Sequence, residues 1–234
     1  MLVLEIFEPN KLGIRNASPA CLKAEALMIL SGVPYQLKSG DVRKSPTGKF
    51  PILHDGGEII ADSSHILEHL RAKYSFTIDS DLTDEQKAIS HTLQHMLEEH
   101  QYFITVYFRW MENPKLMREE LFVDIPNPIR KIIFSIIHNK QKKALHLQGT
   151  SRHSRVQLIE MARDNFKAIA GLLGNKNYVL GDKIHSVDAV VFAQIEAAFS
   201  ATVPTPLKDM AHDFPTLTKY LDRFRDEVFG AKPA

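Results

Sequence analysis

Apolar and polar positions along the first 75 residues predict two groups of strands, each accompanied by one helix. In the first group, Leu2–Phe7 alternates loosely between apolar and polar residues and is typical of a strand, as is Val33–Leu37. Between them, Ser18 followed by proline is a strong helix start, and Gly32 ends a predicted helix over Pro19–Ser31. The first group is therefore strand, helix, strand.

The second group follows a short irregular stretch, Ser39–Thr47. Phe50–His54 and Glu58–Ile60 are predicted strands, joined by an Asp-Gly-Gly turn at residues 55–57 that favours a hairpin. Asp62 and Ser63 then open a helix in which apolar residues recur at helical spacing. The order of this group is strand, strand, helix.

Beyond residue 83 the apolar spacing is that of helices alone. The predicted helices are Asp84–Glu112, Ile129–Gln148, a helix from Ser154 to Gly174, Ser186–Ala201 and Pro215–Phe229. A mixed region followed only by helices predicts two domains. We expect the first at residues 1–76, a linker at 77–83 and an all-helical domain at 84–234.

Composition narrows the function classes without naming one. The 234 residues are 44% hydrophobic and 24% charged, ordinary values for a globular chain long enough to bury a sizeable core. Lys plus Arg total 29 against 28 Asp plus Glu, so the overall charge gives no reason to expect nucleic acid. Cys21 is the single cysteine, and we find no secretory signal or run of 18 apolar residues. We therefore expect a cytoplasmic protein.

Five short motifs occur in an order typical of one family. The first three are Ser-Pro-Ala-Cys at residues 18–21, Gly-Lys-Phe-Pro-Ile at 48–52 and Ala-Asp-Ser at 61–63. The helical region adds Gly-Asp-Lys at 181–183 followed by Asp188, and Phe-Pro-Thr-Leu at 214–217. Together they resemble the glutathione S-transferase superfamily. Ile-Ala-Asp-Ser at 60–63 and Val-Asp-Ala at 187–189 are similar to its failed-axon-connections and metaxin-like branch.

The resemblance implies a fold and a reaction. The fold would be a thioredoxin-like N-terminal domain with a reduced second helix, followed by a helical-bundle C-terminal domain. The reaction would join the thiolate of glutathione, as co-substrate, to a small hydrophobic electrophile in a homodimeric enzyme. Ser18 would donate a hydrogen bond to the sulfur at a helix start, where unpaired N–H groups favour a thiolate.

The remaining contacts would come from the other motifs and from the long helix. Pro51, in a cis peptide bond, would turn the backbone of Phe50 toward an open edge that pairs with the glutathione peptide. Asp62 would bind the γ-glutamyl amine, and Ser63 the adjacent carboxylate. Tyr107 and Trp110 are the residues we expect to form an apolar wall for the electrophile.

Several of these residues also have purely structural explanations. Ser18 and the pair Asp62 and Ser63 could only cap helices, and Cys21, about one turn into its helix, is expected to be a buried packing residue. Two other functions stay open. One is a non-catalytic, metaxin-like binding or adaptor module, which the shortened second-helix region favours. The other is a glutathione-dependent thiol reductase that uses Cys21.

Two histidine pairs have the i, i+4 spacing of metal ligands. They are His65 with His69, and His91 with His95. Neither pair carries the glutamate of a metalloprotease motif, and a structural zinc site needs four convergent ligands. We expect no metal, and histidines on a solvated helix face.

A basic segment has two explanations. Residues 125–159 contain no Asp or Glu but hold Arg130, Lys131, Lys140, Lys142, Lys143, Arg152 and Arg155. We expect a core helix with a solvated basic side. The alternative is an amphipathic helix that lies on an anionic membrane.

Overall fold

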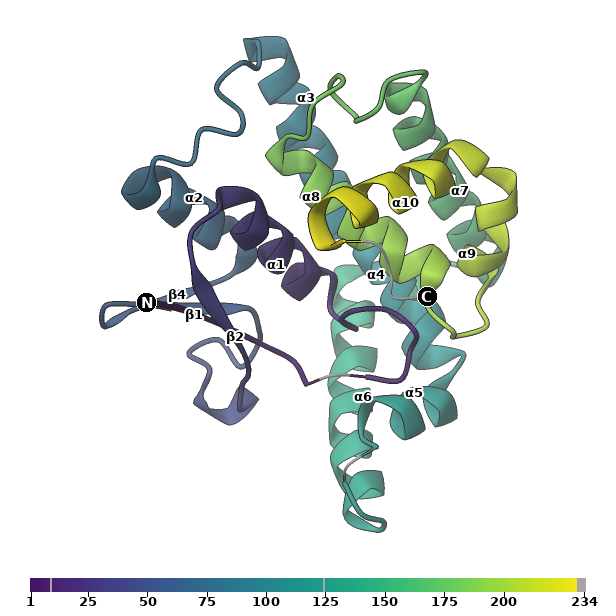
Figure 1. Ribbon diagram of the computed structural model, residues 1–234. Coiled ribbons are helices and arrows are strands. Elements are labelled where there is room, and N and C mark those ends of the chain that lie inside the picture. Colours follow the sequence, from purple (N-terminus) through teal and green to yellow (C-terminus); the bar gives the residue numbers. More distant parts are fainter. Residues whose placement is uncertain (9, 124, 231–234) are drawn as a thin grey trace.

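A four-stranded sheet is built from the first 61 residues (Figure 1). The computed structural model describes residues 1–8, 10–123 and 125–230 of the chain. The strands lie in the order β2-β1-β3-β4, with β2 parallel to β1 and the other pairs antiparallel. Their bounds are β1 Leu2–Ile6, β2 Tyr35–Ser39, β3 Ile52–Asp55 and β4 Glu58–Ala61.

The N-terminal helices follow the predicted signals closely. α1 (Pro19–Ser31) begins at its Ser18 cap and ends at Gly32, whose φ of 67° suits glycine. α2 (Ser63–Tyr74) begins at Asp62. The second strand was predicted two residues too early, because Pro34 has no N–H for the ladder and pairing with β1 starts at Tyr35. Between β2 and β3 the chain forms only a single short turn of helix, η1 (Val42–Lys44), as the reduced second helix predicts.

One long helix opens the helical region. It runs without a break through α3 (Asp84–His95), η2 (Met96–Gln101), α4 (Tyr102–Val106) and η3 (Tyr107–Met111), of which η2 and η3 are π-helical. Its predicted capping box is confirmed, because Thr83 and Gln86 exchange both hydrogen bonds.

The other helices complete a bundle beside the sheet. They are α5 (Pro114–Leu121), α6 (Ile129–Gln148), η4 (Thr150–Arg152), α7 (Arg155–Leu173), α8 (Ser186–Ile195) with η5 (Glu196–Ser200), α9 (Pro206–Asp209), η6 (Met210–Asp213) and α10 (Pro215–Phe229). We predicted neither α5 nor α9. Each begins with a proline at a first-turn position, where the missing N–H costs nothing, whereas we took Pro114 as a break.

α1 is the element that joins the two regions. Nine of its 13 residues are buried, and it packs against α2 on the sheet side and against α8 and α10 on the other (Figure 1). All ten residues of α8 are buried as well. The N-terminus of α1 is therefore held between a thioredoxin-like domain and a helical domain. The boundaries at residues 76 and 84 stay a prediction, and residues 231–234 of the second predicted domain lie outside the described residues.

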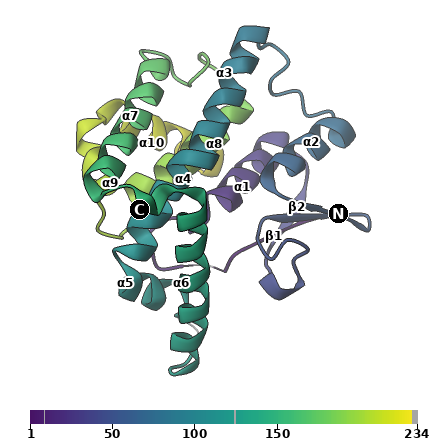
Figure 2. The ribbon, with the colours of Figure 1, turned by 180° about the vertical axis from the view of Figure 1, so that it is seen from behind.

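α6 differs from the core helix that we expected. Only Phe134 and Leu145 are buried among its 20 residues, and one end extends beyond the rest of the molecule (Figures 1 and 2). The expectation was wrong because several apolar residues of this helix lie on the face opposite its buried Phe134 and Leu145 and are exposed. Within the described part of the chain, no helix has both the length and the apolar character needed to cross a membrane.

Candidate functional site

The three N-terminal motifs meet at one end of the sheet. The register pairs Glu5, near the end of β1, with Ile52 of β3, and Ile52 with Ala61 of β4. Asp62 N–H also donates to the Pro51 carbonyl at 3.3 Å. The loop before α1 returns to this end because Asn16 Nδ2 donates to the Phe7 carbonyl at 3.2 Å. The sheet therefore brings together the neighbourhoods of Ser18, Pro51 and Asp62.

Ser18 is a helix cap with a hydroxyl proton left to donate. Its N–H is fixed by Asn16 Oδ1 at 2.9 Å, and its Oγ accepts from Cys21 N–H at 3.4 Å. Ser18 thus caps α1, as the structural explanation predicts, but the capping bond does not prevent the hydroxyl from donating to a ligand. A serine hydroxyl accepts through oxygen lone pairs and still donates its one proton elsewhere. Ser18 is half-buried, so a ligand at the helix end can reach it.

The Phe50–Pro51 peptide bond is cis, which confirms the prediction. The Phe50 ring is buried against Gly40 and packs edge-on against Phe7 at a centroid distance of 5.1 Å. A Cβ at Gly40 would lie 2.3 Å from that ring, so only glycine fits there. Across the described residues no backbone group bonds to the N–H or carbonyl of Phe50. This N–H and carbonyl therefore have no backbone partner among those residues, but the residue is only 5% exposed, less open than the edge that we expected.

Asp62 occupies an unusual backbone position. Its φ is 86° and its ψ is 135°, a region that non-glycine residues rarely adopt and that costs about 1–3 kcal/mol. One carboxylate oxygen caps α2 by accepting from Ser64 N–H at 2.7 Å, and the side chain is exposed. Ser63 is buried and occupies the first position of α2, where an amide N–H has no intrahelical partner. Capping alone does not require this backbone conformation.

A buried lysine connects this region to the long helix. Lys23 of α1 is 1% exposed, and its Nζ lies 2.8 Å from both Ser64 Oγ and Glu98 Oε1. Gln94 Nε2 donates to the same Ser64 hydroxyl and to Glu98 Oε2, each at 2.9 Å. The starts of α1 and α2 are thus tied to η2 through one polar network, which the sequence analysis did not find.

Arg109 is a second residue that we missed. It is 5% exposed, and its guanidinium donates to the carbonyls of Ala17, at 3.0 Å, and Ala197. In the described part of the chain no carboxylate forms an ion pair with it. Burial lowers its pKa to about 10, which leaves it charged at neutral pH. The signal available in the sequence was its position seven residues after Tyr102, two turns along the same face of the long helix.

The two residues of the expected electrophile wall pack in different apolar clusters. Trp110 belongs to an apolar cluster that includes Ala17, but its ring stacks on Phe134 at 5.7 Å. Tyr107 packs against the main core. Both remain half-buried.

Cys21 is fully buried, as expected. Burial raises the pKa of its thiol to about 11, so it is protonated at neutral pH and a poor nucleophile.

The histidine pairs have different environments. His91 and His95 are exposed on α3, in agreement with the expectation. His69 contradicts it, because the ring is largely buried and its Nε2 lies 2.8 Å from Asp55 Oδ2. Asp55, Glu58 and His69 are close enough to share an ion, but the Lys73 ammonium already lies 2.8 Å from Asp55. That contact, with His69 and Tyr74, holds the pKa of Asp55 well below its usual range. A metal would have to displace Lys73.

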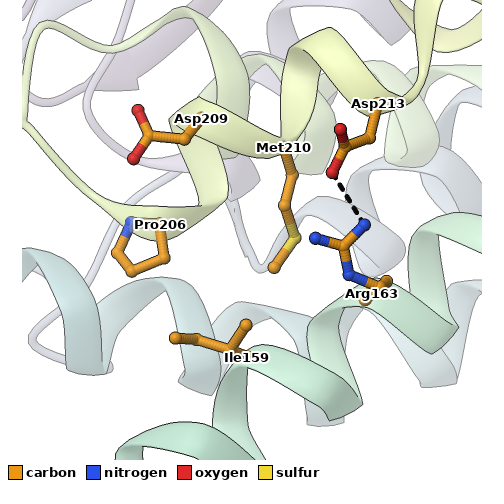
Figure 3. Close-up of a pocket in the computed structure, with 6 residues that line it drawn as sticks. All are labelled: Ile159, Arg163, Pro206, Asp209, Met210 and Asp213. Carbon is orange, nitrogen blue, oxygen red and sulfur yellow. Dashed lines mark hydrogen bonds and ion pairs between the residues drawn. The ribbon is translucent and has the colours of Figure 1, made fainter.

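A separate cavity of about 350 Å³ lies in the helical region (Figure 3). Ile159 and Arg163 of α7 face Pro206, Asp209, Met210 and Asp213 across it, and Arg163 pairs with Asp213 at 2.7 Å. It shares no residue with the three motifs.

Comparisons with known proteins agree over most of the chain. Family models described as the glutathione S-transferase N-terminal domain and the glutathione S-transferase C-terminal domain match residues 19–115 and 162–224. The chain is 30% identical to Failed axon connections of Drosophila melanogaster over 92% of its own length and 55% of that protein's. It therefore spans about half of that relative.

Two further relatives are matched over most of their lengths. Identity is 25% with isoprene-epoxide–glutathione S-transferase of Rhodococcus, over 92% of this chain and 94% of that protein. Identity is 18% with human metaxin-2, over 90% of this chain and 82% of that protein. Among solved structures, a glutathione S-transferase of Ceriporiopsis subvermispora in complex with glutathione superimposes with a TM-score of 0.64. That match has 19% identity and covers 99% of this chain and 98% of the other, and it concerns the fold.

Proposed function

The chain belongs to the glutathione S-transferase superfamily, and we propose that it binds glutathione at the shared end of its sheet and conjugates the thiolate to a small hydrophobic electrophile. The observation that carries this proposal is the unpaired backbone of Phe50 beside Asp62. An amide and a carbonyl without backbone partners suit the peptide of glutathione, and the positive φ of Asp62 is a strain that helix capping does not explain.

The proposed binding mode uses each motif once. Phe50 pairs with the cysteinyl backbone of glutathione. Ser63, with the first amides of α2, holds the γ-glutamyl carboxylate, and Asp62 holds the amine. These contacts place the sulfur near the start of α1. There the Ser18 hydroxyl and the helix dipole stabilise the thiolate.

The reaction then needs no covalent enzyme intermediate. The thiolate sulfur forms a bond to an electrophilic carbon as the bond to the leaving oxygen or halide breaks. With an epoxide the ring opens, and the resulting alkoxide takes a proton from water. Juxtaposition and thiolate stabilisation supply the rate enhancement. The Rhodococcus relative makes a small epoxide a sensible first probe. A cytoplasmic homodimer is part of the same proposal.

Calorimetric titration with glutathione tests the binding step. We expect Asp62→Asn, which keeps the Ser64 cap and tolerates positive φ, to weaken binding by 10-fold or more because the charge contact to the amine is lost. Asp84→Asn, at the exposed first position of α3, is the matched control and should bind normally. Conjugation of a small epoxide, followed by mass spectrometry, tests the chemistry.

The competing function is a non-catalytic adaptor. The single turn η1 between β2 and β3 and the metaxin-2 relationship favour it. Glutathione binding without conjugation of any epoxide or halide would support this alternative, and absence of glutathione binding would exclude the transferase. The reductase alternative is disfavoured by the buried, protonated Cys21.

A further inference from the structure

α6 presents a row of apolar side chains to solvent. Ile129, Ile132 and Ile136 are 54%, 61% and 53% exposed. Their spacing of three and four residues places them on one face of the helix. Leu147, 68% exposed, lies five turns from Ile129 on the same line. The buried side chains of α6, Phe134 and Leu145, are on the opposite face.

The same face is basic. Lys140 and Lys143 fall on the line of exposed apolar residues, whereas Lys142 lies about a third of a turn away from it; all three are exposed. No acidic residue occurs between positions 125 and 159. Within the described ranges, no carboxylate pairs with any of these three lysines. Nothing on this helix neutralises its charge.

The helix is firmly attached to the body of the protein. Trp110 stacks on Phe134 with an interplanar angle of 7°. At the N-terminal end, Arg130 donates to the carbonyls of Ile125, at 2.7 Å, and Val123, at 2.8 Å, in the segment that leads into the helix. Gln148 Nε2 donates to the Glu99 carbonyl at 3.0 Å at the other end. The exposed apolar residues therefore lie on a helix that extends beyond its neighbours (Figure 2).

We propose that this face of α6 docks on the surface of a membrane that contains anionic lipid. The isoleucines would enter the boundary between headgroups and acyl chains, and the lysines would contact lipid phosphates. Charge disfavours a symmetric pairing of α6 with α6 of a second copy, since the two helices would oppose their lysines with no carboxylate on either. Nucleic acid would use the lysines but would leave the isoleucines in water.

Co-sedimentation with vesicles tests the proposal. The full chain should bind vesicles of phosphatidylcholine with about 30% phosphatidylserine, and should bind pure phosphatidylcholine at least about 10-fold more weakly. Raising the salt from 0.1 to 0.5 M should release it, because surface charges are screened. Equal binding to both vesicle types, or binding that salt does not affect, would overturn the proposal.

Substitutions assign the binding to α6. Replacing Lys140 and Lys143 with Gln should weaken binding by about fivefold for each lysine, roughly 25-fold in total. The control replaces Lys176 and Lys219, which are exposed on other segments, and should leave binding unchanged. Ile132→Ser should also weaken binding, whereas Ile59→Ser, at a 57% exposed position on β4, should not.

Two further measurements keep the test decisive. Melting curves establish that each variant is folded. Sedimentation equilibrium without lipid tests the alternative, in which a second copy of the chain covers this face of α6. If Ile132→Ser dissociates a dimer while the wild-type protein does not bind anionic vesicles, this face of α6 is an interface between copies and the lipid proposal fails.

Discussion

The guanidinium of Arg109 lies 3.0 Å from the carbonyl oxygen of Ala17, the residue that precedes Ser18. A buried cation without an ion-pair partner among the described side chains is costly, so its location is informative. Here it positions the loop that leads into α1 and adds positive charge behind the helix end at which we propose the thiolate binds.

We therefore predict that Arg109→Met raises the thiol pKa of bound glutathione. The pH–rate profile of conjugation should move to higher pH by about one unit, because an opposite charge near the thiolate is removed. Arg109→Lys, which keeps the charge, should shift it less. Stability should also fall, since two carbonyls lose their donor. Arg118→Met on α5 is the control; a purely structural role would lower the melting temperature and leave the profile of the folded molecules in place.

Ser18→Ala separates the cap from the catalytic role. Loss of the hydrogen bond to a charged sulfur should reduce the rate roughly 10- to 100-fold near neutral pH. Glutathione affinity should change little, because Phe50, Asp62 and Ser63 hold the peptide. Loss of the cap alone costs about 1 kcal/mol of stability and spares the rate per folded molecule. An unchanged pH–rate profile with a lowered melting point would leave Ser18 as a cap only.

The Lys23–Glu98 pair should show strong coupling in a double-mutant cycle. Lys23→Met or Glu98→Met alone leaves an unpaired charge in a buried network and should cost about 3–5 kcal/mol of unfolding free energy. The double variant should recover much of that loss. Lys167→Met and Asp164→Met, an exposed pair at 3.5 Å on α7, provide the control cycle and should change stability little. Additive losses at Lys23 and Glu98 would contradict the coupling.

Asp188 predicts a pH dependence of stability. Burial raises its pKa to about 6, against the partly offsetting hydrogen bonds from the His185 and Val179 amides and the Tyr220 hydroxyl. Since the folded pKa lies above the unfolded value of 3.8, this residue contributes stability that is present below pH 4 and is lost as the pH rises through 6.

The measurement compares Asp188→Asn with the wild type by urea unfolding. The stability advantage of the wild type should shrink by roughly 3 kcal/mol between pH 4 and pH 7. Asp164→Asn, at an exposed position, should show a constant difference. A constant difference for Asp188→Asn would mean that the carboxyl is ionised throughout.

Local signals in the sequence were sufficient for much of the fold. Pro19–Ser31, Ile129–Gln148 and Pro215–Phe229 match the structure end to end because caps and glycines fix where those helices start and stop. Residues recognised by local motif, such as the cis peptide bond at Pro51, were also found.

Long-range partners could not be read from the sequence. Lys23 looked like an ordinary surface lysine of a helix, and its burial depends on Glu98, 75 positions away. Arg109 is equally inconspicuous until Ala17 and Ala197 are brought to it by the packing of α1 and η5. The isoleucines of α6 were predicted to be buried because apolar residues normally lie in the core, but the structure exposes them.

The burial of α1 on both sides makes the thioredoxin-like unit incomplete by itself. A fragment ending near residue 80 would uncover the side of α1 that faces α8, and the remaining fragment would uncover the fully buried α8. Each half would thus expose an apolar surface that promotes aggregation. Heating should melt the whole chain in a single cooperative transition, and two separately expressed halves should regain solubility when mixed.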